Sequence, residues 1–121
     1  MEGKGKKDWI FADGDLPPAG KEPPYGHEAL MIVNTGDAPV KCELTVYFED
    51  SPPKKGIFID IESQRVRCIR LDQPLGKENY KIPFGQYALH VEADKPIVAV
   101  FGRLDVRQNN LAYYPVQGFS C

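Results

Sequence analysis

Hydrophobic and polar residues alternate with a period of two along most of this chain. Between residues 40 and 48, for example, Val, Cys, Leu, Val and Phe alternate with Lys, Glu, Thr and Tyr. This period places successive side chains on opposite faces of an extended strand, so each such run predicts a half-buried β-strand. Helical periodicity is almost absent. The predicted strands, about eight in number, cover residues 9–11, 27–34, 40–48, 57–61, 65–68, 86–93, 97–104 and 111–116.

The spacing of these predicted strands indicates the fold class. Each strand is short and is bounded by turn-forming residues, as in segments 34–37 (Asn-Thr-Gly-Asp) and 93–96 (Ala-Asp-Lys-Pro). Short strands at regular spacing are typical of antiparallel sandwiches and barrels. We therefore expect an all-β fold, an antiparallel β-sandwich of about eight short strands.

Two of the predicted strands are apolar on both faces. Residues 29–33 read Ala-Leu-Met-Ile-Val, and residues 97–101 read Ile-Val-Ala-Val-Phe. In a two-layer antiparallel sandwich the outer face normally meets water, so these strands need a second cover. Another subunit, the proline-rich segment of the chain or closure into a barrel could supply it. We favour a subunit interface, because the interfaces of obligate homo-oligomers resemble a core cut in half.

Charged residues follow the second of these strands. Arg103, Asp105 and Arg107 lie on the same face as Ile97 and alternate residues after it, so the strand leaves the core at a polar rim. These charges could form a ladder of ion pairs, each worth roughly 0–1 kcal/mol. Alternatively, Asp105 could hold a guanidinium fork in place, with Gln108 adding amide hydrogen bonds to a polar ligand or partner.

A long proline-rich segment, residues 13–26, separates the first two predicted strands. It begins with Asp13-Gly14-Asp15, which has two elements of a calcium loop, lacks the rest and is expected to be a turn. Proline fixes φ and favours extended geometry, so the segment is stiff. It could form one wall of a cleft or a lid over the end of the sandwich. Trp9, the only tryptophan, precedes it and is expected to pack in the core, although it could also stack on a sugar or a partner residue.

Length, charge and cysteine content limit the class of protein. The 121 residues predict one domain, residues 8–121, preceded by a disordered basic tail, residues 1–7. A net charge of −2 and a pI near 5.7 argue against nucleic acid or an anionic membrane as a partner. No apolar stretch is long enough for a spanning helix, and nothing after Met1 resembles a signal peptide. With three widely spaced cysteines, we expect a cytoplasmic protein with reduced thiols.

The motifs of common enzyme classes are missing from the sequence. The chain has no glycine-rich phosphate loop, nucleophile elbow, Cys-x-x-Cys or His-Glu-x-x-His motif. A metal site needs three or four ligands, and His27 and Glu28, as neighbours on a strand, point to opposite faces. His27 and His90 could meet only if their strands pair in the right register. We therefore expect a protein that is not an enzyme and that has no metal site and no cofactor.

Short segments spread along the chain form an ordered set. They are Trp9–Pro18, His27-Glu28, Ile32–Asp37, Tyr47–Asp50, Arg65–Arg70, Ile82-Pro83, Pro96–Val98 and Arg103–Gln108. In this order they resemble the sensory rhodopsin transducer family. The resemblance implies a sandwich reminiscent of carbohydrate-binding folds, a homotetramer, and a signalling or ligand-binding role without known catalysis. The chain departs from the family at Phe101-Gly102, where the family carries a polar His-Thr pair, and it looks shorter and more aromatic after Gln108.

These inferences predict a recognition surface on the polar rim of a homo-oligomer. Its residues are Trp9, Asp13, His27, Glu28, Arg103, Asp105, Arg107 and Gln108. We expect a non-catalytic, transducer-like protein that binds a signalling partner, such as a membrane photoreceptor, or a small polar ligand, such as a carbohydrate. Two alternatives stay open: a small β-barrel metal-dependent enzyme and a purely structural assembly protein.

Overall fold

The computed structural model describes residues 1–107 and 112–121. This part of the chain contains eight strands. They are β1 (Lys6–Leu16), β2 (His27–Asn34), β3 (Val40–Tyr47), β4 (Lys54–Ile61), β5 (Arg65–Arg70), β6 (Gly85–Asp105), β7 (Ala112–Val116) and β8 (Gly118–Ser120). Every pair of these strands that is hydrogen-bonded is antiparallel. The prediction of an all-β antiparallel fold is confirmed.

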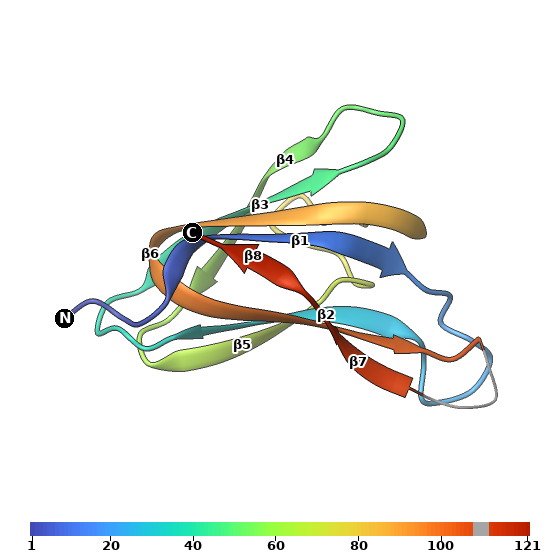
Figure 1. Cartoon of the computed structure of the whole chain (residues 1–121), viewed down its shortest axis with the longest axis horizontal. Coiled ribbons are helices and arrows are strands. Elements are labelled where there is room, and N and C mark those ends of the chain that lie inside the picture. Colours follow the sequence, from blue (N-terminus) through green and yellow to red (C-terminus); the bar gives the residue numbers. More distant parts are fainter. Residues whose placement is uncertain (108–111) are drawn as a thin grey trace.

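The long strand β6 connects two layers. Its first half pairs with β3 and β1 in a sheet of order β4-β3-β6-β1-β8, called sheet I here. Its second half pairs with β2 and β7, and β2 also pairs with β5, which gives sheet II the order β5-β2-β6-β7. In Figure 1 the β6 ribbon bends at the left of the molecule and returns along the other layer. A strand that switches sheets in this way makes one corner of a sandwich.

Several strand boundaries differ from the predicted ones, and three of the differences affect the topology. Residues 94–96, expected to be a turn, form the bend inside β6, so two predicted strands are one. No register pair involves these three residues, and the missing N–H of Pro96 therefore interrupts no ladder. Asp13-Gly14-Asp15, also expected to be a turn, lies within β1 at an irregularity between Phe11 and Gly14. The three-residue strand β8 is not among the predicted strands, since it is too short to show alternation.

The amino-terminal residues lie against the turn between β2 and β3. β1 begins at Lys6, so the boundary expected after residue 7 falls inside a strand. The amino group of Met1 forms an ion pair with Asp37 at 2.7 Å, and the backbone N–H of Lys4 donates to Thr35 Oγ1 at 2.7 Å. Lys6 and Lys7 are therefore part of the folded sheet rather than of a tail.

The hydrophobic core lies between the two sheets. Leu44 and Val91 of sheet I and Leu30 of sheet II are completely buried in it. The aromatic rings of Phe11 and Phe101 meet across the layers with their centroids 5.4 Å apart. Burying each large side chain contributes roughly 1.5–3 kcal/mol, so these contacts hold the two sheets together.

Cys42 on β3 gives this core a pH-dependent contribution to stability. Burial, together with the charges of Asp94 and Asp60, raises the pKa of Cys42 from 9.0 to about 12. The thiol of the unfolded chain ionises near 9, whereas the folded one stays protonated. Its stabilising contribution is therefore complete below pH 9 and is lost as the pH rises from 9 towards 12.

We expect wild-type protein to lose more stability between pH 8 and pH 10 than a Cys42→Ala variant does. The expected difference is roughly 1 kcal/mol, because one unit of pKa corresponds to about 1.4 kcal/mol. Urea unfolding at both pH values measures it. Cys121→Ala, which removes an exposed thiol, is the matched control and should behave like wild type. Equal losses in wild type and Cys42→Ala would contradict the assignment.

Candidate functional site

A buried carboxylate, Glu28 of β2, is the centre of the polar groups predicted from the sequence. Its side chain is completely buried. Arg103 Nε donates to Oε2 at 2.8 Å, the hydroxyl of Tyr87 donates to Oε1 at 2.6 Å, and the backbone N–H of Asp15 donates to Oε2 at 3.0 Å. Burial and the adjacent Glu28 charge raise the pKa of Tyr87, which keeps its hydroxyl a neutral donor. Glu28 thus joins strands of both sheets.

Arg103 is held on all sides by its own chain. It lies directly opposite Glu28 in the β2–β6 ladder and is only 6% exposed. Nη2 donates to the carbonyl oxygen of Asp13 at 2.6 Å, Nη1 donates to the hydroxyl of Tyr114 at 3.3 Å, and the guanidinium lies 5.5 Å from the centroid of the Tyr114 ring. Burial lowers the pKa of Arg103, but the hydrogen bonds to Tyr114 and Glu28 outweigh it and leave the pKa raised. This geometry makes Arg103 part of the fold's polar centre.

Two tyrosines of this centre are absent from the predicted site. Tyr87 follows from the alternation of residues 86–93 only as a core residue, and Tyr114 only as a residue of the last predicted strand. The contact of Tyr114 with Arg103 depends on the pairing of β7 with β6, and that of Tyr87 with Glu28 depends on how the two layers meet. The one signal in the sequence is the tyrosine itself, whose hydroxyl needs a hydrogen-bond partner when the ring is buried.

The outer part of the rim is exposed to solvent. Asp105 and Arg107 form a local ion pair, and Arg107 Nε donates to Asp105 Oδ1 at 3.0 Å. This pair lowers the pKa of Asp105 and raises that of Arg107. The Asp13 side chain is 69% exposed, and His27 Nδ1 lies 2.8 Å from the carbonyl oxygen of Tyr25. Exposed aromatic residues accompany these charges at the same end: Tyr25, Tyr113 and Tyr114.

Trp9, another of the predicted site residues, lies apart from this arrangement. Trp9 packs against the core from β1, in register with Val91, and its Nε1 donates to the carbonyl oxygen of Lys6 at 3.1 Å. Gln108 lies outside the described residues. The structure therefore brings together Asp13, Glu28 and Arg103, places Asp105 and Arg107 as a separate pair, and assigns Trp9 to packing.

The proline-rich segment forms one wall of a cleft. The Gly26 N–H donates to the carbonyl oxygen of Ala19 at 2.8 Å, which closes this loop. On one side, a Cβ added to Gly20 would lie 3.0 Å from Val106 Cγ2, so the loop packs beside the end of β6. On its other side is a cleft of about 430 Å³, lined by Leu16, Pro17, Ala19, Gly26, Asp72, Gln73, Lys81, Ile82, Pro83 and Phe84.

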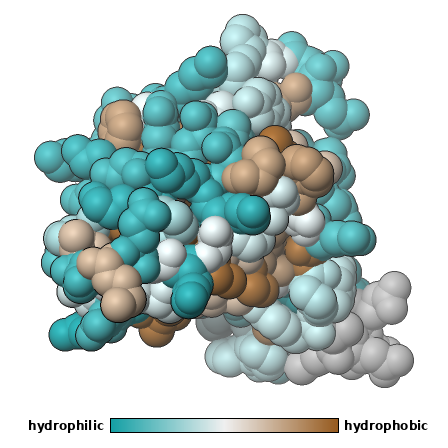
Figure 2. Space-filling view, turned by 60° about the vertical axis from the view of Figure 1, so that its left-hand side comes forward, coloured by the Kyte–Doolittle hydropathy of each residue, from teal (hydrophilic) through white to brown (hydrophobic). Residues whose placement is uncertain are grey.

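The outer face of sheet II is apolar. Two adjacent rows cross β5, β2 and β6 in register: Val66, Val33 and Val98 in one, and Cys68, Met31 and Val100 in the other. Val66 is 68% exposed and Val100 47%. By contrast, the end of the molecule where β6 bends is mostly hydrophilic, with small separate apolar patches (Figure 2). The proline-rich loop packs against Val106 rather than over these rows. The strand order has two ends, so the described strands do not close into a barrel.

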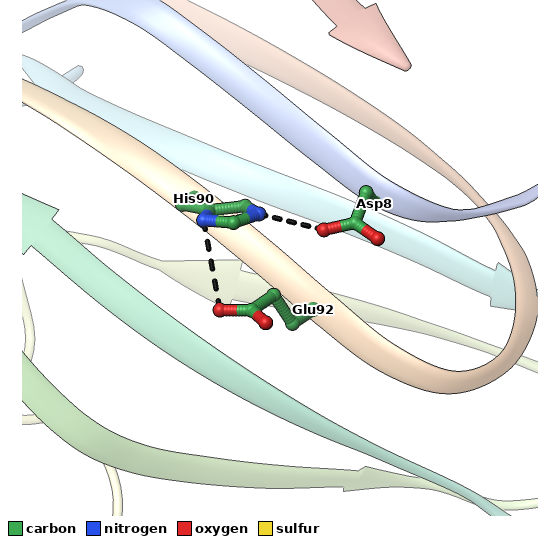
Figure 3. A group of neighbouring side chains, drawn as sticks. All are labelled: Asp8, His90 and Glu92. Atoms are coloured by element: carbon green, nitrogen blue, oxygen red, sulfur yellow. Dashed lines mark hydrogen bonds and ion pairs between the residues drawn. The ribbon is translucent and has the colours of Figure 1, made fainter. Parts of the chain in front are cut away.

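A second group of titratable side chains lies on the outer face of sheet I (Figure 3). His90 Nε2 is 2.8 Å from Asp8 Oδ1, and His90 Nδ1 is 3.6 Å from Glu92 Oε1. His27 and His90 lie on different sheets, since His27 pairs with Leu104 and His90 with Ile10. The two histidines whose meeting the sequence left open are therefore apart, and His90 has two carboxylates as neighbours instead.

Fold and site together define a two-layer, all-β protein with a closed polar centre, an exposed charged rim and an apolar outer face. Among the described residues, no helix has the length and hydrophobicity needed to cross a bilayer. The family model described as Anabaena sensory rhodopsin transducer matches residues 4–120. The chain belongs to this family.

Two solved structures are similar to this chain. The crystal structure of Thermotoga maritima 1070 has a TM-score of 0.83 and 32% sequence identity, and the match covers 96% of this chain and 95% of that one. The Anabaena sensory rhodopsin transducer has a TM-score of 0.73 and 27% identity, over 84% of this chain and 99% of that one. No curated protein sequence matches this chain.

Proposed function

We propose that this protein is a non-catalytic signal transducer that works as a homo-oligomer, a tetramer, and binds a membrane photoreceptor of the rhodopsin class through its charged rim. The observation that supports the proposal is the difference in solvent exposure between the inner and the outer residues of the rim. The Glu28–Arg103 centre is closed by the chain itself, whereas Asp13, Arg107 and the neighbouring tyrosines remain exposed. Exposed charges and tyrosines on a rigid base suit a protein partner better than a catalytic reaction.

The oligomer rests on the apolar outer face of sheet II. Half-exposed Val100 and largely exposed Val66 belong to two continuous apolar rows, and contiguous patches of this kind mark interaction surfaces. A second copy of the same face is the cover that the sequence predicts. The three free cysteines suit the reducing environment of the cytoplasm, where we place the protein.

Binding to a microbial sensory rhodopsin reconstituted in nanodiscs tests the proposed partner. We expect isothermal titration calorimetry to detect binding that Arg107→Glu weakens at least tenfold, because the substitution reverses the charge presented at the rim. The matched control is Lys77→Glu, which reverses an exposed charge outside the rim and should leave the affinity unchanged. Absence of binding, or equal losses in both variants, would contradict the proposal.

A small ligand in the cleft beside the proline-rich loop is a second candidate. It is favoured by the volume of about 430 Å³ and by Phe84, which is 74% exposed at the edge of the cleft and could stack on a sugar ring. A thermal-shift screen of mono- and disaccharides should then show stabilisation by one sugar class that Phe84→Ala abolishes. A screen without any stabilisation would remove this candidate.

A further inference from the structure

We propose that Asp8, His90 and Glu92 bind a divalent transition-metal ion, with Zn²⁺ as the reference ion, on the outer face of sheet I. These three residues are not part of the proposed rim, and they lie on sheet I rather than at the end where β2 and β6 carry the rim. One ligand atom from each of the three lies within 4.8 Å of one from each of the others. The proposal is independent of the proposed function, because the site lies on a different sheet from the apolar face.

Strand register explains why the three side chains converge. Asp8 of β1 and Glu92 of β6 are direct cross-strand partners, so they share a face of the sheet. His90 precedes Glu92 by two residues and therefore points to that same face. The imidazole lies between the two carboxylates, with one ring nitrogen towards each of them (Figure 3).

The distances are close to those of a metal site. Around a tetrahedral zinc ion with bonds of about 2.0–2.2 Å, neighbouring ligand atoms lie about 3.4 Å apart. His90 Nδ1 and Glu92 Oε1 are already separated by 3.6 Å, a gap too long for a hydrogen bond. The side chains of Asp8 and Glu92 are 41% and 52% exposed, so rotation of the carboxylates can bring both to the same ring nitrogen.

The local charge also favours a cation. Glu43 of β3 lies directly opposite Glu92 and adds a third carboxylate to this face, where it accepts a hydrogen bond from the Gly56 N–H at 3.0 Å. Within the described residues, His90 is the only basic side chain within 4.0 Å of Asp8 or Glu92. Two carboxylates therefore share one imidazole. An imidazole ligand favours Zn²⁺, Ni²⁺ or Cu²⁺ over Mg²⁺ and Ca²⁺, which prefer oxygen ligands alone.

Zinc titration of a Cys68→Ser/Cys121→Ser protein tests the site. This background removes the two exposed thiols, which bind zinc themselves. The chain has only two histidines, so NMR of the imidazole nitrogens reports on each separately. We expect calorimetry to give one zinc ion per protomer, with shifts at the His90 ring nitrogens and none at His27.

Matched substitutions in the same background decide between the site and its alternatives. His90→Gln and Glu92→Gln should each weaken zinc binding at least tenfold, whereas His27→Gln should leave it unchanged. Glu92 is largely exposed, so its variant keeps the test valid even if His90→Gln unfolds. Absence of saturable binding, binding that survives both substitutions, or His90 signals that respond to pH but not to zinc would overturn the proposal.

Discussion

Replacing Arg103 with methionine is expected to lower the free energy of unfolding by about 3–5 kcal/mol. The reason is the environment of Glu28, which is completely buried and receives a hydrogen bond from Arg103 Nε at 2.8 Å. Methionine fills much of the space of arginine but leaves the carboxylate without its positive partner. A buried charge without a partner is far more costly than the loss of a surface ion pair. Urea unfolding followed by circular dichroism, at one fixed protomer concentration, measures the change.

Two further variants separate this effect from a general loss of arginine. Arg107→Met removes an arginine whose side chain is half exposed, and it should change stability by less than about 0.5 kcal/mol. Adding Glu28→Gln to Arg103→Met removes both charges and should recover part of the loss, because the uncompensated charge is gone. If Arg103→Met stays within about 1 kcal/mol of wild type, the polar centre does not hold the two sheets together.

Replacing Val100 with lysine is expected to dissociate the proposed oligomer at micromolar concentration. Val100 lies at the β6 end of one of the two apolar rows of sheet II, in register with Met31, and is already 47% exposed in a single protomer. Lysine can extend into water there, so the protomer keeps its fold. In the assembly the same ammonium group would be buried against a second apolar face without a partner, at a cost of several kcal/mol. Size-exclusion chromatography with light scattering measures the mass of the particle in solution.

The matched control for this prediction lies on the opposite sheet. Phe119 of β8 is an exposed apolar residue on sheet I, and Phe119→Lys should leave the mass of the assembly unchanged. A second readout is the thiol of Cys68, which lies in the same row of sheet II as Val100, on the other side of Met31. It should be protected from thiol reagents in wild type and reactive in Val100→Lys. Dissociation by Phe119→Lys, or an unchanged mass for Val100→Lys, would place the interface elsewhere.

The strands could be predicted because their alternation is a local property of the sequence. Residues 40–47 form a strand within the predicted range 40–48, since a period of two is visible wherever a sheet has one buried face. Residues 94–96 carry ordinary turn chemistry, yet they form a bend within β6. Whether such a segment reverses the chain or turns a corner depends on where the next partners lie, β2 and β7 in this case. That information is not local.

The site was predictable only in part for the same reason. Glu28 and Arg103 are singled out by charge within apolar strands, and their pairing across β2 and β6 follows once those strands are neighbours. Tyr87 and Asp15 complete the centre from β6 and β1, which no spacing in the sequence indicates. His90 meets Asp8 instead of His27 because β6 pairs with β1 through its first half and with β2 through its second half. Strand register decided each of these contacts.

Sedimentation equilibrium of the wild-type protein at micromolar concentration tests the proposed assembly most directly. We expect a mass of four protomers of 13.6 kDa each, with the outer face of sheet II buried between pairs of protomers. A mass of 13.6 kDa, with Cys68 freely reactive towards thiol reagents, would show that a single protomer tolerates this apolar face in water and would contradict the proposed assembly.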